Sequence, residues 1–248
     1  NESAEWLQIS GGYVRPPIEQ ARREGFVEIR VNAPVQSESP MEERLRQRFG
    51  LKKVVLVPSL SNQADPTILE EEVAGEACQY LDSIVASGMQ ISFSWGRTIY
   101  RVSQRLKARP DISGVVALPL CGGSTHLNRH IYVSEISTNL AAAYNGMPLS
   151  IPLPAILDSE EIKDAVCGDA NIKAVLGRIP QSDISLFTAG ELGDQNSVYP
   201  SGYSDDAPLQ RLRRQGAVGD IVARPIDEQG EVGDTDRDSR TGHVDLDR

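Results

Sequence analysis

Short apolar runs alternate with amphipathic helical segments along most of this chain, and this alternation restricts the fold more than any other feature. A short apolar run bounded by turn residues is typical of a strand that is buried on both faces. Strands separated by helices form a mostly parallel sheet, with helices covering both faces. The predicted strands are 26–31, 53–58, 89–95, 114–120, 149–154, 184–189 and 217–224, and the predicted helices are 41–49, 68–87, 97–108, 133–145, 158–168, 171–177 and 209–215.

The charge and cysteine content argue against several classes of protein. The 35 acidic and 25 basic residues give a formal net charge of −10, which repels nucleic acid unless a separate basic module makes the contact. Cys78, Cys121 and Cys167 lie far apart without CxxC spacing, so neither a disulfide framework nor a zinc site is predicted. No apolar run approaches the roughly 20 residues of a membrane-spanning helix. We therefore expect a soluble cytoplasmic protein with no membrane partner and no cofactor.

Changes in pattern divide the chain into three parts. Residues 1–25 form a small N-terminal segment with a predicted helix starting near Arg15. The main domain, residues 26–228, begins where the period-two alternation of 26–31 predicts a strand with one exposed face. Residues 229–248 contain six acidic residues and three arginines but few apolar ones, so they bury too little surface to offset the entropy lost on ordering. This third part is predicted to be a mobile acidic tail.

The segment Ser94–Thr98, SWGRT, joins a predicted strand to a predicted helix. The N-terminal amides of a helix and its dipole favour an anion, and Gly96 allows the anion to approach closely. Arg97 and Thr98 add a charged donor and a hydroxyl donor. We predict a phosphate-binding loop here, with Ser94 among its contacts; the alternative is an ordinary helix cap with a surface arginine.

Further glycine-bearing loops follow other predicted strands, at the strand ends where open parallel sheets bind ligands. In the loop that starts at Cys121, the cysteine is predicted to be a small buried side chain, because no base is expected beside it. Asp220, near the last predicted strand, has a carboxylate that either accepts hydrogen bonds from a polyol or stabilises a turn. No catalytic or metal-binding residue is predicted. The predicted ligand contacts in these loops are Gly122, Gly123, Ser124, Gly190 and Asp220.

Five segments follow one another along the chain: ARREGFVEIR at 21–30, LRQRFGLKKVVLVPS at 45–59, SWGRT at 94–98, CGGS at 121–124 and GAVGDI at 216–221. In this order they resemble the effector-binding domain of the SorC family of bacterial sugar-responsive transcriptional regulators. The resemblance spans residues 18–226, and an ordered set of motifs is more specific than any single one. It implies the fold shared with glucosamine-phosphate deaminase, ribose-phosphate isomerase and CoA transferases, a Rossmann-like, mostly parallel sheet with helices on both faces.

The resemblance also implies a function, the binding of a phosphorylated sugar. Effector binding is then expected to change the packing of a homodimer or homotetramer, and thereby the affinity of a helix-turn-helix module for operator DNA. By the same resemblance, the phosphate loop falls on Gly96, Arg97 and Thr98, the second glycine loop on Gly122 and Gly123, and the acidic ligand contact on Asp220.

Three departures from the family pattern bear on these expectations. Residues 5–25 resemble only the recognition-helix half of a helix-turn-helix, and Pro16 and Pro17 stand where the family has helix formers, which argues against DNA binding by this chain. The strand, glycine turn and helix that carry a ligand-contacting lysine in the family do not follow Asp247 in this sequence. The loop 188–193, TAGELG, differs from the family's GIG-type turn. The DNA contacts that the partial module would offer are Tyr13, Arg15 and Arg22.

Two alternatives to a regulator stay open. The same fold carries aldose-phosphate isomerases and deaminases, which need an acid or base beside the reacting carbon of the substrate. Glu191 and Asp194 are acidic residues near the end of the predicted strand 184–189, but no acid–base pair is evident, so we expect no enzyme activity. The other alternative is a non-functional fragment of a regulator, because an uncovered sheet edge and apolar surface oppose folding.

Overall fold

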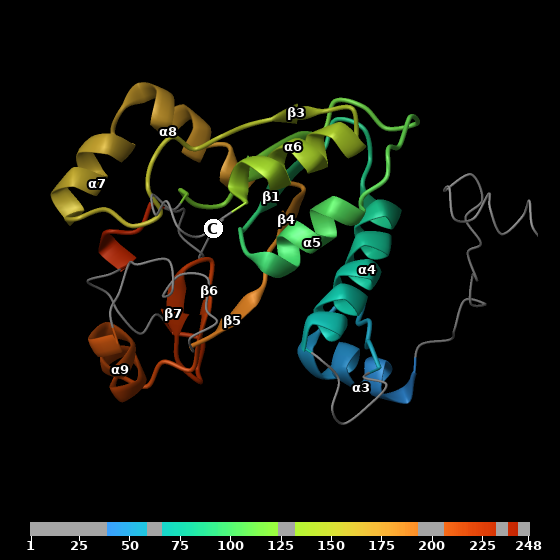
Figure 1. The fold of residues 1–248 in the computed structure, drawn as a ribbon, viewed down its shortest axis with the longest axis horizontal. Coiled ribbons are helices and arrows are strands. Elements are labelled where there is room, and N and C mark those ends of the chain that lie inside the picture. Colours follow the sequence, from blue (N-terminus) through green and yellow to red (C-terminus); the bar gives the residue numbers. More distant parts are fainter. Residues whose placement is uncertain (1–38, 59–65, 124–131, 193–205, 232–237, 243–248) are drawn as a thin grey trace, which may run out of the picture. The chain divides into compact units, whose positions relative to one another are not determined.

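The computed structural model describes residues 39–58, 66–123, 132–192, 206–231 and 238–242 (Figure 1). The chain divides into two units, residues 1–56 and residues 57–248. Because residues 1–38 lie outside the described part, the strand predicted at 26–31, the N-terminal segment and the start of the main domain stay predictions.

Helix α3, Pro40–Phe49, confirms the helix predicted in the first unit. It begins with a capping box: the hydroxyl of Ser39 accepts from the amide of Glu42 at 3.2 Å, and the Glu42 carboxylate accepts from the Ser39 amide at 2.7 Å. It ends at Gly50, whose φ of 64° places it in the left-handed conformation typical of helix C-caps.

The strand predicted at 53–58 is wrong, because residues 51–58 form no helix or strand. The amide of Leu56 donates to the Glu42 carboxylate at 2.8 Å, so it serves the start of α3 instead of a strand ladder. Val55 is also 39% exposed, whereas the apolar run had suggested a buried strand. Hydrophobicity alone does not make a strand where the backbone finds no partner strand.

The second unit contains a four-stranded parallel sheet in the order β3-β2-β1-β4, which confirms the predicted fold class. The central strands are the most buried, as expected for a sheet covered on both faces. The strands are β1 (Gln90–Phe93), β2 (Val116–Pro119), β3 (Met147–Pro148) and β4 (Ile184–Leu186).

Helices cover both faces of this sheet, as predicted (Figure 1). Successive strand residues point to opposite faces, and β2 shows the separation: Ala117 packs in the core formed with α4, α5 and α6, and Leu118 in the core formed with α8 and η1. The helices are α4 (Pro66–Ile84), α5 (Arg97–Arg105), α6 (Val133–Ala143), α7 (Glu160–Cys167), α8 (Ala170–Leu176) and the 3₁₀ turn η1 (Ile179–Gln181).

A second, antiparallel sheet of three strands was not predicted. It has the order β5-β6-β7, with β5 at Ala189–Glu191, β6 at Gly219–Ile221 and β7 at Arg224–Ile226, and α9 (Asp206–Arg214) precedes β6. The strand predicted at 184–189 is therefore divided between the two sheets. The strand predicted at 217–224 is divided by a hairpin turn between β6 and β7.

This hairpin turn has an unusual sequence. Val222 and Ala223 both have positive φ, 51° and 66°, as a two-residue hairpin turn of the favoured kind requires. Asn and Gly are typical at such positions, and a β-branched residue there is strained. Both residues are buried in the apolar core, which offsets the strain. A run of apolar residues thus concealed a turn.

The strand predicted at 149–154 is also wrong, since β3 comprises only Met147–Pro148. Proline has no amide hydrogen for a strand ladder, and it occurs at 148, 152 and 154. Beyond β3 the chain forms single bridges instead, from Pro154 to Gly123 and from Ile156 to Thr241.

Residues 238–242 pack against the domain, although the tail was expected to be mobile. Thr241 is only 2% exposed, and Asp238 forms an ion pair with the buried Arg224 at 2.6 Å. The composition of the tail did not predict this packing, because residues 238–242 are held by backbone hydrogen bonds and one ion pair and not by buried apolar side chains. We call residues 238–242 the C-terminal strap.

None of the helices in the described part of the chain combines the length and the low polarity that a membrane-spanning segment needs.

Candidate functional site

Two of the predicted loops meet at the carboxyl ends of β1 and β2. These strands are parallel neighbours with Phe93 opposite Pro119, so the segments that follow them leave the sheet at the same edge. A direct hydrogen bond joins the loops: the indole Nε1 of Trp95 donates to the carbonyl of Gly122 at 2.9 Å, within the protein interior. The structure therefore brings together the phosphate loop and the second glycine loop that the sequence predicted.

The N-termini of α5 and α6 have no side-chain cap, whereas those of α3, α7 and α8 have one. The caps of α3, α7 and α8 are the side chains of Ser39, Ser159 and Asp169, whereas the N-cap of α5 is Gly96. The first turn of α5 contains no acidic residue and begins with Arg97. No side chain of α5 therefore caps its N-terminus, and the positive end of its dipole favours an acceptor from outside the helix.

Ser94 adds a second feature that favours a ligand. Its side chain is 4% exposed, and its buried Oγ has no hydrogen-bond partner among the described residues. The backbone is fixed, because the Ser94 amide donates to the carbonyl of Leu186 at 2.8 Å. An unsatisfied buried hydroxyl costs about 1–3 kcal/mol, and a hydrogen bond to a bound molecule would remove that cost.

Arg97 points to a neighbouring helix in this structure. Its guanidinium lies 3.1 Å from the carboxylate of Glu70 on α4, and its side chain is 52% exposed. Thr98, the next residue, is partly buried in the first turn of α5. The predicted phosphate contacts therefore lie together at the start of α5, with Arg97 engaged by an acidic group.

In the second glycine loop, Gly122 and Gly123 have amides that are already paired with backbone carbonyls. Gly122 donates to Gly242 at 3.1 Å, and Gly123 donates to Leu153 at 3.1 Å. A β-carbon at position 122 would lie only 2.4 Å from the Leu153 carbonyl oxygen, so glycine is needed there because of close packing. These two glycines shape the loop. Ser124, predicted beside them, lies outside the described residues.

Asp220 and Gly190 lie opposite each other on β6 and β5. Asp220 is 7% exposed, and a β-carbon at the adjacent Gly219 would lie 2.8 Å from the Gly190 carbonyl oxygen. The strands therefore pack closely here, and the carboxylate of Asp220 is held in a largely buried position.

Cys121, at the start of the second glycine loop, interacts electrostatically with the carboxylate of Asp220. Burial raises the pKa of the Cys121 thiol to about 12; a hydrogen bond with Trp95 opposes the rise, and the negative charge of Asp220 adds to it. Cys121 therefore stays a neutral thiol at ordinary pH, in agreement with the prediction of a buried, unreactive side chain. The same interaction indicates that Asp220 lies near the loop that follows β2.

The C-terminal strap is a part of the site that the sequence analysis missed. The carbonyl of Gly242 accepts from Gly122, and its amide donates to Ala155 at 2.8 Å. At the other end of the strap, Asp238 binds Arg224 of β7 through both carboxylate oxygens, at 2.6 and 3.3 Å. The strap thus connects the second glycine loop to the hairpin next to Asp220. Single bridges have no sequence period, so the sequence pattern held no signal for them.

Glu70 was missed for a similar reason. It lies on a long amphipathic helix among other acidic residues, where a glutamate is usually a solvent-facing side chain. Across the described ranges, no group of three or more histidine, cysteine or acidic side chains could hold a metal ion. The predicted DNA contacts Tyr13, Arg15 and Arg22 lie outside these ranges.

The fold and the site can now be compared with known proteins. The family described as "Putative sugar-binding domain" matches residues 33–248. The chain belongs to this sugar-binding family. It is 29% identical over 243 residues to the deoxyribonucleoside regulator of Bacillus subtilis, covering 98% of this chain and 76% of that protein. It is 26% identical over 239 residues to the sorbitol operon regulator of Klebsiella pneumoniae, covering 92% and 72%.

Two solved structures of transcriptional regulators have the same fold. The full-length sorbitol operon regulator SorC from Klebsiella pneumoniae superposes with a TM-score of 0.81 at 23% identity, covering 98% of this chain and 78% of that one. The probable sor operon regulator from Shigella flexneri has a TM-score of 0.73 at 25% identity, covering 84% and 80%. These comparisons confirm the predicted SorC resemblance, the fold class and a sugar-binding domain of the kind found in transcriptional regulators.

Proposed function

We propose that this chain senses a phosphorylated sugar for a bacterial transcriptional regulator, and that the phosphate binds at the N-terminus of α5. The observation that supports this most strongly is the uncapped start of that helix, next to the buried hydroxyl of Ser94, which has no partner among the described residues. The amides of Gly96 and Thr98, the Thr98 hydroxyl and the Arg97 guanidinium supply donors of the kind that phosphate requires.

The sugar would extend from this phosphate towards Asp220. A buried carboxylate accepts hydrogen bonds from adjacent hydroxyl groups, which suits a polyol. Gly122 and Gly123 would form the wall of the site, because their amides are paired with backbone carbonyls. In this proposal Gly190 keeps the backbone close beside Asp220, and Ser124 contributes a further hydroxyl.

Regulation requires that the sugar phosphate bind one state of the protein more tightly than another. Two relatives are a deoxyribonucleoside regulator and a sorbitol operon regulator, which supports operator DNA as the partner of the intact regulator. A homodimer or homotetramer is part of this proposal. We propose binding without turnover. Glu191, the described candidate for an acid or base, is exposed on β5, where it lacks the desolvated setting that tunes catalytic carboxylates.

Thermal unfolding of the chain with pentose and hexose phosphates, each compared with its free sugar, tests this function. A ligand at about 100 times its Kd adds roughly 2.7 kcal/mol, and a chain of this size gains about 2–4 °C per kcal/mol. We expect one phosphorylated sugar to raise Tm by about 5–10 °C, and its free sugar to have little effect. Arg97→Gln should remove this shift while lowering the ligand-free Tm only slightly, because its ion pair is exposed. Equal shifts with free sugar and phosphate would contradict the proposal.

A further inference from the structure

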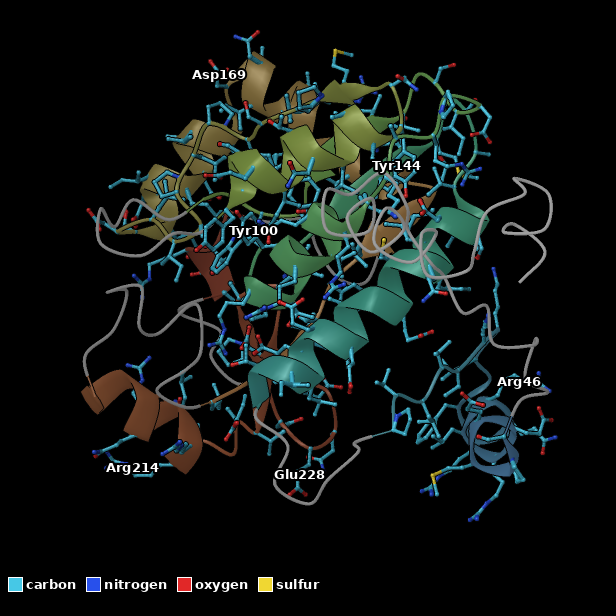
Figure 2. The ribbon with its side chains drawn as sticks, turned by 45° about the vertical axis from the view of Figure 1, so that its right-hand side comes forward. Arg46, Tyr100, Tyr144, Asp169, Arg214 and Glu228 are labelled. Carbon is cyan, nitrogen blue, oxygen red and sulfur yellow. The ribbon has the colours of Figure 1, made fainter. Side chains whose placement is uncertain are left out.

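Five charged side chains tie α4 to α5 beside the proposed phosphate site. Helices α4 and α5 pack side by side (Figure 2). One carboxylate oxygen of Glu70 lies 3.1 Å from Arg97, and the other lies 3.2 Å from Arg101. Arg101 and Arg105 also pair with Glu71. We call these five residues the α4–α5 ion-pair cluster, in which Glu70 bridges two arginines.

Arg97 is the member of the ion-pair cluster best placed to change partner. Its side chain is 52% exposed, compared with 24% for Arg101, which contacts both glutamates. Arg97 is also the first residue of α5, where the helix dipole disfavours a cation and favours an anion. Three guanidinium groups face two carboxylates, so the cluster has one more positive charge than negative.

We infer that the phosphate of the effector competes with Glu70 for Arg97, and that binding thereby breaks the ion pair between α4 and the start of α5. This rests on the proposed function. A sugar phosphate has up to two negative charges and three acceptor oxygens, whereas the carboxylate has one charge and already binds Arg101. Arg97 therefore moves to the phosphate, and Glu70 stays with Arg101.

The consequence lies at the beginning of α4. Glu70 is near the N-terminal end of this helix, which starts at Pro66, whereas the pairs of Glu71 with Arg101 and Arg105 are unaffected. Loss of one contact loosens the first turns of α4 and leaves the rest of the helix packed on α5. These turns follow directly, in sequence, the residues that lead from the N-terminal unit. The exchange of partners thus reports effector binding to the N-terminal side of the chain.

The test compares Glu70→Gln with Glu76→Gln. Both remove one charge from α4, but Glu76 is exposed. Its carboxylate accepts a side-chain hydrogen bond from Gln79 at 3.3 Å and forms no ion pair with the described part of α5. Inorganic phosphate is the probe, titrated at constant ionic strength and read by thermal unfolding. Because the competitor is removed, Glu70→Gln should tighten phosphate binding roughly two- to five-fold, the equivalent of an exposed ion pair, and Glu76→Gln should leave it unchanged.

Two further measurements separate this inference from the function on which it rests. In an Arg97→Gln background, Glu70→Gln should have no effect on phosphate binding. Amide hydrogen exchange at residues 70–75 should become faster when phosphate binds the unaltered chain, and should already be fast in Glu70→Gln.

Each outcome decides a different point. Suppose that Arg97→Gln weakens phosphate binding, but Glu70→Gln leaves phosphate binding unchanged or weakens it. Glu70 then does not compete with the phosphate for Arg97, so the competition is refuted while the phosphate site stands. If the unaltered chain does not bind phosphate, or Arg97→Gln binds it equally well, the proposed function fails and the competition fails with it.

Discussion

Gly122→Ala is the substitution that most directly tests the geometry of the second glycine loop. A β-carbon there would lie 2.4 Å from the carbonyl oxygen of Leu153 and 2.5 Å from that of Pro154. Both atoms belong to the backbone, so they cannot rotate away as the end of a flexible side chain can. Ordinary contact begins near 3.4 Å, and the two segments must therefore separate by about an ångström.

The expected loss of stability follows from the contacts between these segments. Separation weakens the hydrogen bonds from Gly123 to Leu153, at 3.1 Å, and from Ala155 to Gly123, at 2.7 Å. Each contributes about 1 kcal/mol, and overpacking adds about 1–3 kcal/mol. Replacing glycine stabilises by about 0.4–1 kcal/mol through the unfolded chain. We expect the free energy of unfolding to fall by about 2–4 kcal/mol, and Tm to fall by roughly 5–15 °C.

Urea unfolding followed by circular dichroism measures this change, and Gly75→Ala is the matched control. Gly75 lies inside α4 with no heavy atom within 4 Å of an added β-carbon, so the same substitution there should stabilise by about 1 kcal/mol. If Gly122→Ala unfolds within about 0.5 kcal/mol of the unaltered chain while Gly75→Ala behaves as expected, the close packing inferred for the loop is incorrect.

Three further outcomes follow from the structure. Ala223→Gly should change the free energy of unfolding by less than about 0.5 kcal/mol, because relief of the positive φ offsets the lost methyl group, whereas Ala141→Gly inside α6 should cost about 1 kcal/mol or more in the same urea assay. Cys121 should resist alkylation by iodoacetamide at pH 8 until urea unfolds the chain, because burial raises the pKa of its thiol; rapid labelling of the folded chain would contradict this. The hydrogen bond from the Leu56 amide holds the pKa of Glu42 below its usual range. The stability that this bond adds is therefore present above the unfolded-state pKa of Glu42 and is lost as the pH falls through its folded-state pKa. In an NMR titration, the chemical shift of the Leu56 amide should report that lowered pKa.

The parallel sheet could be predicted because its signals are local. The run ending in β1 and the amphipathic pattern of α4 each specify an element without reference to the rest of the chain. The turn at Val222 and Ala223 could not be predicted, because burial in the folded core imposes a conformation that these residues disfavour alone. The prediction for the exposed run after α3 was wrong for the opposite reason: its residues have a high strand propensity, but no neighbouring strand pairs with them.

In the candidate site too, only the features with a local sequence signal could be predicted. The uncapped start of α5 was visible as a glycine, an arginine and a threonine in succession after an apolar run. The carboxylate of Glu70 was not, because a contact between two helices depends on how they pack. The sequence predicted Gly122 as a ligand contact, whereas the structure shows that glycine is needed there for its small size.

The two hydrogen bonds of Gly122 have an implication for the order in which the chain folds during synthesis. Gly122 receives the indole of Trp95 at its carbonyl, and its amide is held by Gly242. A ribosome exposes the strands of the parallel sheet well before residue 242 leaves the exit tunnel, so the sheet can assemble while the loop still lacks its second hydrogen bond. The second glycine loop is therefore completed after the sheet, and the proposed sugar-phosphate site reaches its final form late in synthesis.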